Sequence, residues 1–401
     1  MQSVNFRDPD FLEDHIRRIL AFYHPRCVDR EHGGFFQHFR DDGSVYDHAT
    51  RHLVSSTRFV FNYASAATHF QNSEYRDVAE HGLSFLLEAH WQPPQQGFAW
   101  VLNNREASDE VNYCYGLAFV VLAAASAMKA SVPRAFEVLE LAIDVLDSRF
   151  WIDADGLYAD EASVGWTTLS EYRGQNANMH GCEALIASYE ATGESRYLHR
   201  ALAIARRVTK DLTQQCDGFV WEHYDARWKV DWEFNRDNPK DLFRPWGIQA
   251  GHQTEWAKLL VILDRYCDEE WLLPTAQDLF DRTLRRAWDA EHGGIVYGNA
   301  PDGSVCDDDK YFWVQAETFA AAAALAVATG NDEYWDWYDR IWKYSWSHFV
   351  DHEHGAWFRI LTPDNRKYDD LKSPAGKTDY HTMGACYEAI RSQTESSSSP
   401  G

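Results

Sequence analysis

Hydrophobic and polar positions follow one another along this chain in two kinds of helical segment. Segments of the first kind repeat apolar residues every three or four positions, which is typical of a helix with one buried face. They lie at residues 11–24, 74–91, 133–151, 195–212, 269–288 and 332–349. Segments of the second kind are apolar nearly all round, as at residues 111–128 and 311–329. The pattern predicts an outer ring of half-exposed helices and an inner ring of buried ones.

A short glycine turn followed by an aromatic or aliphatic pair stands between each outer segment and the next inner one. Its copies include EHGGFFQHF and DADGLYADE. The spacings between the markers are 63, 59, 62, 76 and 61 residues, for Gly34, Gly97, Gly156, Gly218, Gly294 and Gly355. A period of this length indicates a repeat architecture. We therefore expect six helical hairpins with short glycine-containing β-hairpin loops at one rim.

The hairpins predict an all-α fold, an (α/α)6 barrel in which six pairs of helices close into a toroid. Closure buries the inner helices on all sides. An open solenoid is the alternative, but it needs polar capping repeats, which are not evident in the sequence. We expect one catalytic domain at residues 5–392, followed by a flexible tail, QTESSSSPG, at residues 393–401.

Composition narrows the functional classes. The chain has 38 Lys and Arg against 62 Asp and Glu, a net charge of −24, so its field repels a nucleic-acid backbone. Seven cysteines without a CxxC motif indicate thiols in a reducing compartment. No run of 18 apolar residues and no signal-peptide pattern is visible. We expect a cytoplasmic protein without a membrane partner, and the sequence leaves a monomer and a homodimer open.

Polar residues near the starts of the six inner helices are the candidate site. If outer helix, glycine turn and inner helix alternate, every inner helix begins at the same rim, and these residues converge. The starts supply Arg58, Tyr115, Asn176, His180, His252, Glu255, Trp313, Glu317 and His381. Asn176 and His180 are spaced i,i+4, and His252 and Glu255 are spaced i,i+3, so each pair shares a helical face. We expect Glu255 to orient or tune the imidazole of His252.

Histidines titrate near neutrality and can take and return a proton. An arginine among them can polarise a carbonyl or hold an enediolate oxygen. No phosphate loop, dinucleotide fingerprint or activated nucleophile is apparent, so we expect no cofactor. The residues favour proton abstraction next to a carbonyl.

Three other readings of the same residues stay open. Three His and a Glu are also zinc ligands, although the chain has no HExxH motif. Glu255 and Glu317 are candidates for the two carboxylates of an inverting glycosidase. A sugar-binding toroid without turnover is the third alternative, which the presence of both His252 and His381 disfavours because a binder needs no opposed proton carriers.

At these residues the sequence resembles the N-acylglucosamine 2-epimerase superfamily of six-hairpin toroids. The likeness is strongest in STRFVF (56–61), NANMHGCEA (176–184), FWVQAE (312–317) and KTDYHTMGACYE (377–388). The longest matching stretch is RPWGIQAGHQTEWAKLL (244–260), and residues 228–256 resemble the branch that isomerises mannose.

The resemblance implies roles for individual residues. Arg58 resembles the family's carbonyl-binding arginine, His252 and His381 its acid/base pair, and Glu255 the carboxylate beside the first histidine. Asn176 and His180 resemble its substrate-binding pair, and Trp313 an aromatic wall, while Tyr115 and Glu317 complete the expected substrate contacts.

The resemblance also implies a reaction. It is metal-independent interconversion of D-mannose and D-fructose through ring opening and a cis-enediolate. The 76-residue interval also inserts Trp228, Trp232, Phe234, Phe243 and Trp246 before His252, and this insertion is either a surface hairpin or a lid that closes over the sugar. Cellobiose and N-acylglucosamine 2-epimerases are the alternatives, but their patterns GHDxE and GHxxEAGW differ from GHQTEWAK here.

Overall fold

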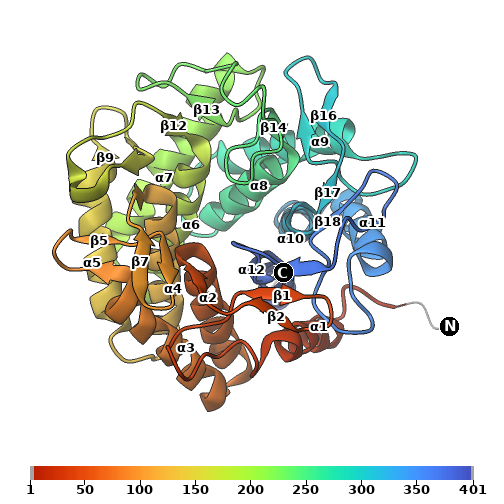
Figure 1. Cartoon of the computed structure of the whole chain (residues 1–401). Coiled ribbons are helices and arrows are strands. Elements are labelled where there is room, and N and C mark those ends of the chain that lie inside the picture. The colour runs from red at the N-terminus through yellow and green to blue at the C-terminus, as the bar shows by residue number, and fades with distance from the viewer. Residues whose placement is uncertain (1–3, 399–401) are drawn as a thin grey trace.

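The computed structural model describes residues 4–398. Within them the helices form two concentric rings, which Figure 1 shows end on. The inner ring consists of α2 (Leu53–Phe70), α4 (Cys114–Lys129), α6 (Gln175–Thr192), α8 (Ala250–Asp264), α10 (Phe312–Thr329) and α12 (Tyr380–Ser398). The outer ring consists of α1 (Pro9–Tyr23), α3 (Ser73–Phe85), α5 (Ala135–Val145), α7 (Ser195–Arg206), α9 (Leu272–Ala287) and α11 (Asp332–His348). The predicted (α/α)6 barrel is confirmed.

The ring is closed. Contacts between inner helices run from α2 through α4, α6, α8, α10 and α12 and back to α2. At the seam, strand β1 (His38–Arg40) pairs with β19 (Leu371–Ser373) from the other end of the chain. Arg7 also donates from Nε to Asp339 Oδ1 of α11 at 3.1 Å. These contacts exclude the open solenoid.

Burial explains the two sequence patterns. The outer helix α9 buries Ala276, Leu279, Phe280 and Leu284, which recur at helical spacing on one face. The inner helix α10 is buried nearly all round, because its alanines let neighbouring helices approach closely. Among the residues described, α10 is also the helix that is long and apolar enough to cross a membrane, but it is mostly buried, as the core helix of a barrel would be.

Small antiparallel sheets form one rim and fix where each inner helix begins. A strand stands directly before each of the first five inner helices, and β19 precedes α12 with residues 374–379 between them. Each of these strands pairs with a strand from the following hairpin or, at the seam, from the first one. These sheets are β3 (Thr50–His52) with β6 (Val101–Asn103) and β7 (Glu106–Asp109), β8 (Asn112–Tyr113) with β11 (Glu161–Ala162), β12 (Arg173–Gly174) with β13 (His223–Tyr224), β14 (Ile248–Gln249) with β15 (Gly298–Asn299) and β16 (Val305–Asp307), β17 (Lys310–Tyr311) with β18 (Ile360–Leu361), and β19 with β1 and β2 (Val45–Asp47).

Five of the six glycine turns lie between paired backbone segments, as predicted, whereas the turn at Gly218 has no such pairing within the described residues. Two of the five pair β4 (Trp91–Gln92) with β5 (Gly97–Phe98) and β9 (Trp151–Ile152) with β10 (Leu157–Tyr158). Gly34 and Gly156 have φ of +68° and +65°, which glycine adopts without strain. Gly97 differs, because the left-handed residue there is Gln96, with φ +52°. Gly97 is required for space, since a Cβ would lie 2.2 Å from Asn112 Oδ1.

Two further features bear on the sequence predictions. All seven cysteines are free thiols, and five of them are buried. At the C-terminus, α12 runs to Ser398, so helix occupies most of the segment predicted as a tail, and residues 399–401 lie outside the described residues. The domain limits of 5–392 stay a prediction.

Candidate active site

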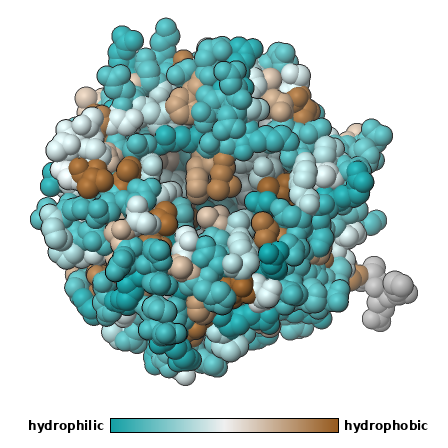
Figure 2. Space-filling model, in the orientation of Figure 1, coloured by the Kyte–Doolittle hydropathy of each residue, from teal (hydrophilic) through white to brown (hydrophobic). Residues whose placement is uncertain are grey.

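The N-terminal ends of the inner helices surround a pocket at the strand-bearing rim. Figure 2 shows this face hollowed at its centre, with apolar residues in the hollow. The residues predicted from the helix starts that line it are Arg58, Tyr115, Asn176, His180, His252, Glu255, Trp313 and His381. These eight residues therefore converge on one pocket, as predicted. Glu317, the remaining residue, lies behind His381 instead of on the pocket surface.

His252 is held by a carboxylate that the sequence did not reveal. Its Nδ1 lies 3.0 Å from both carboxylate oxygens of Glu222, which is itself buried just before β13. Gln175 donates to Glu222 Oε2 at 2.9 Å and keeps the carboxylate in place. The prediction that Glu255 orients His252 is thus wrong in this geometry, because the Nδ1 side of the ring faces the loop after α7.

His381 has an equivalent arrangement. Its Nδ1 lies 2.7 Å from Glu317 Oε1, and the other oxygen of Glu317 accepts a hydrogen bond from Lys258. Burial lowers the pKa of His381 well below its usual value, and the positive charge of Arg58 lowers it further. The imidazole is therefore neutral near pH 7. With Nδ1–H donated to Glu317, the Nε2 lone pair is left for the pocket.

His180 and Glu255 form a third group. His180 Nδ1 bonds to Glu183 Oε2 at 3.0 Å, and Glu183 Oε1 accepts from the Tyr380 hydroxyl at 2.5 Å. Glu255 lies farther away, with Oε1 at 3.9 Å from His180 Nδ1. Both oxygens of Glu255 are buried without a hydrogen-bond partner. Burial, together with the nearby charge of Glu317, raises the pKa of Glu255 well above its usual value, so it is a neutral acid.

Trp313 packs against both His252 and His381. Its ring centroid lies 5.1 Å from that of His252 and 5.5 Å from that of His381. The ring fits there because residue 251 is glycine, where a Cβ would lie 2.3 Å from the indole. Trp313 is therefore a wall shared by the two imidazoles.

Arg58 brings the cation to the opposite wall. Its guanidinium donates to the Gly376 carbonyl at 2.5 Å and to the Tyr115 hydroxyl at 3.1 Å. It also lies 4.4 Å above the Phe119 ring, which favours a desolvated cation. Asn176 presents a buried Oδ1 without a partner. A cation and an amide on one wall suit the hydroxyl and carbonyl oxygens of a small polar ligand.

The insertion before α8 covers part of the pocket, but less of it than the sequence suggested. Of the five inserted aromatics, Phe243 alone is among the pocket-lining residues within the described chain, beside Leu242 and Pro245. Its ring lies 6.2 Å from that of Tyr115. The other four, Trp228, Trp232, Phe234 and Trp246, pack against Tyr224, Trp221 or Tyr172. The insertion therefore contributes one aromatic side chain to the pocket.

Residues outside the helix starts complete the walls. They come from the rim segments that separate the helices or lead into them, and the sequence did not mark them as site residues. They include Tyr297, Tyr311, Arg359, Ile360, Pro374 and Lys377. Burial lowers the pKa of Lys377 to about 8, although its Nζ bonds Asp379 Oδ2 at 2.5 Å.

Three sets of side chains in the described residues lie close enough together to bind a metal ion, Asp307–Asp309 at the rim and two sets at the pocket. The two at the pocket are His180 with Glu183 and Glu255, and His381 with Glu255 and Glu317. Lys258 already supplies a positive charge to Glu317. We therefore expect dialysis against EDTA to leave the turnover number unchanged, measured before and after dialysis. Loss of activity that Zn²⁺ or Mn²⁺ restores would contradict this expectation.

Comparisons with known proteins agree with this geometry. The family described as N-acylglucosamine 2-epimerase (GlcNAc 2-epimerase) matches residues 34–385. The chain is 52% identical over 395 residues to a D-mannose isomerase of Marinomonas mediterranea, covering 98% of this chain and 100% of that protein. It is 33% identical to a D-mannose isomerase of Pseudomonas cannabina pv. alisalensis, covering 92% and 89%.

Solved structures are similar to this chain over nearly its whole length. A crystal structure of D-mannose isomerase superposes with a TM-score of 0.95 at 51% identity, covering 97% of this chain and 100% of that one. Cellobiose 2-epimerase from Bacillus thermoamylovorans reaches a TM-score of 0.84 at 18% identity, covering 96% and 100%. This second likeness concerns the fold alone.

Proposed function

Because the chain belongs to the N-acylglucosamine 2-epimerase family, we propose that it is an aldose–ketose isomerase that interconverts D-mannose and D-fructose. One observation carries the proposal. Two buried histidines from different helices, His252 and His381, face one pocket, and each has Nδ1 on a carboxylate. This geometry supplies two imidazoles with oriented Nε2 atoms, which proton transfer at a sugar carbon needs and simple binding does not.

The reaction begins with opening of the hemiacetal ring. A proton must reach the ring oxygen while the anomeric hydroxyl loses one. The protonated Glu255 and the imidazole of His180, which lie side by side in the pocket, are placed to give and take these protons. The open-chain carbonyl oxygen is then held by Arg58, whose charge stabilises the oxyanion that forms next.

Transfer of the C2 proton follows. One of the two histidines takes the proton at Nε2, and the carboxylate on its Nδ1 stabilises the imidazolium, as in other oriented His–carboxylate pairs. Arg58 holds the resulting cis-enediolate. Return of the proton to C1 on the same face, with transfer of the O2 hydroxyl proton to O1, gives the ketose, whereas return to C2 from the opposite face gives the epimer.

The cover of the pocket supports the ketose as the product. An epimerase must let the intermediate expose its other face to the second base. Phe243 reaches across to Tyr115, and Trp313 occupies the space against both histidines. A planar intermediate between these rings has little room to turn. Isomerisation therefore needs less motion in this pocket than epimerisation does.

The test is product analysis by NMR. D-mannose is incubated with the protein in D₂O, and fructose, glucose and deuterium incorporation are followed, with cellobiose in a parallel sample. We expect fructose carrying deuterium at C1 and little glucose, and no change in cellobiose. Glucose as the main product, or cellobiose turned over as fast as mannose, would favour a 2-epimerase, and no reaction would favour a binding protein. Cytoplasmic location stays a prediction.

A further inference from the structure

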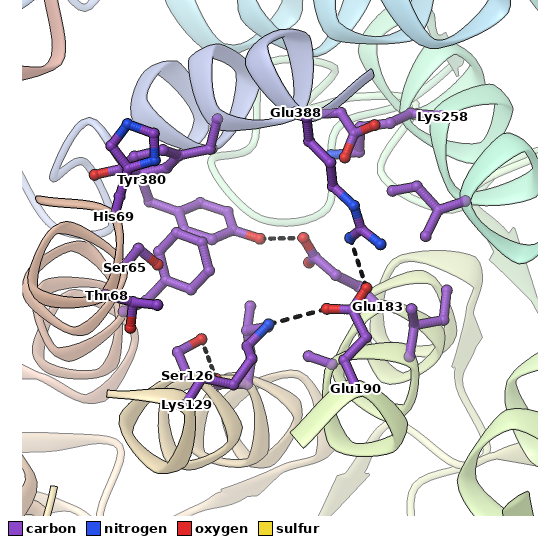
Figure 3. A pocket seen from close by; sticks show the side chains of 18 of the residues that line it. Ser65, Thr68, His69, Ser126, Lys129, Glu183, Glu190, Lys258, Tyr380 and Glu388 are labelled. Atoms are coloured by element: carbon purple, nitrogen blue, oxygen red, sulfur yellow. Dashed lines mark hydrogen bonds and ion pairs between the residues drawn. The ribbon is translucent and has the colours of Figure 1, made fainter. Parts of the chain in front are cut away.

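The barrel has a second cavity at the end away from the sugar pocket. It has a volume of about 540 Å³ and is lined by the middle and C-terminal parts of the inner helices, together with Glu317 and Tyr380 near the starts of α10 and α12. Figure 3 shows charged side chains around it, with Lys129 of α4 bound to Glu190 of α6 and the Tyr380 hydroxyl bound to Glu183. Lys258 and Glu317 line the same cavity.

Four groups form the wall between this rear cavity and the sugar pocket. They are Glu183, Lys258, Glu317 and Tyr380, which line the rear cavity and not the sugar pocket. Glu317 has one oxygen on His381 and the other on Lys258. Glu183 likewise has one oxygen on His180 and the other on Tyr380. The carboxylates behind these two histidines are therefore held from the rear.

Lys258 is the ammonium in this wall. Its side chain is 9% exposed and Glu317 is 2% exposed. Burial alone lowers the pKa of Lys258, but the charges of Glu317 and Glu183 and the hydrogen bond to Glu317 outweigh it and raise the pKa above the usual value. Lys258 therefore stays protonated throughout the physiological range.

Glu317 depends on this charge. Its pKa lies above the usual value, because burial raises it more than the charge and hydrogen bond of Lys258 lower it, and the charge of Glu183 raises it further. The titratable and charged groups that face it are Lys258 and Glu255 from α8, Glu183 and His180 from α6, His381 and Tyr380 from α12, and, through His381, Arg58 from α2. Without the positive charge of Lys258, the negative charges of Glu183 and Glu317 would repel each other in a buried site. Glu317 would then take up a proton.

We propose that Lys258 is a positioning residue: its ammonium, placed on the side away from the sugar, keeps Glu317 ionised and so holds His381 with its proton on Nδ1 and its Nε2 free to act as base. The proposal rests on the proposed role of His381 in proton transfer. A protonated Glu317 can donate to Nδ1, which would put the imidazole proton on Nε2 and remove the base. Lys258 thus acts through Glu317 and touches no substrate.

The test compares Lys258→Met with Lys129→Met. Both variants remove one ammonium from the rear cavity, but Lys129 pairs with Glu190 and contacts neither histidine carboxylate. For Lys258→Met on D-mannose we expect kcat to fall at least about 10-fold, KM to change little, and the acid limb of the kcat profile to move up by about one pH unit, because Glu317 then protonates more readily. Lys129→Met should keep the wild-type profile.

Chemical rescue separates charge from packing. Lys258→Ala leaves space beside a cavity that reaches solvent, so propylammonium should restore turnover and 1-propanol, its neutral analogue, should not. Lys258→Arg keeps the positive charge and should retain the wild-type pH profile. This variant tests the proposal if the Met and Ala variants do not fold.

Three results would overturn the proposal. The first is an unchanged kcat and profile in Lys258→Met. The second is equal rescue by both additives, and the third is a displaced acid limb in a folded Lys258→Arg. If wild-type protein makes no fructose from mannose, the proposed function fails instead, and the two failures are thereby distinguished.

Discussion

Replacing either His252 or His381 by alanine is expected to lower kcat on D-mannose by about 10²- to 10⁴-fold, the usual contribution of a positioned acid or base. Each ring lines the pocket and has a carboxylate on Nδ1, so its loss removes one proton carrier and leaves a buried carboxylate facing a hole. Initial rates of fructose formation measure the effect, and circular dichroism checks that the barrel still forms.

His199→Ala is the matched control, because His199 is an exposed residue of the outer helix α7. It should leave kcat unchanged. Full activity in either pocket variant would contradict the assignment. A fall of the same size in His199→Ala would show that loss of any histidine perturbs the fold and that the pocket variants report nothing specific.

Glu222→Gln should produce the second large effect, a fall in kcat on the order of 10²-fold or more, comparable with other losses of a carboxylate that fixes a histidine tautomer. The amide can donate to Nδ1 of His252, which would favour the tautomer with its proton on Nε2. KM should change less, because Glu222 is absent from the pocket lining within the described residues. Steady-state kinetics on D-mannose measures both constants.

Glu291→Gln is the control for Glu222→Gln. Glu291 is exposed in another glycine turn and has the same charge to lose. A Glu222→Gln protein with wild-type kcat would show that His252 needs no charged partner. A change confined to KM would place Glu222 in substrate binding instead.

The fold could be predicted because its determinants are local and repeated. Helical periodicity, all-round apolar segments and glycine turns recur along the chain, and each is visible without knowing what packs against it. The rim strands, mostly of two or three residues, carry no readable alternation. Closure was predictable from burial, but the seam contacts, such as Arg7 with Asp339, depend on residues far apart in sequence.

The site was predicted where it lies on helix starts and missed elsewhere. The i,i+3 spacing that was expected to pair His252 with Glu255 instead pairs His180 with Glu183, which was not predicted from the sequence. The spacing of two residues along a helix shows that they share a face, but it does not show how an imidazole ring is rotated. The carboxylate that binds His252 is therefore Glu222, from a loop. The sequence did not indicate a role for Lys258, because its burial depends on the packing of the whole barrel.

The most direct test of the account is the fate of deuterium at C2 of the substrate. D-mannose labelled with deuterium at C2 is converted in ordinary water, and the fructose is analysed by NMR and mass spectrometry. Proton transfer through His252 or His381 predicts a primary isotope effect on kcat/KM and loss of part of the label to water from the imidazolium. Complete retention of deuterium at C1 of fructose would instead show direct hydride transfer and contradict proton transfer by the histidines.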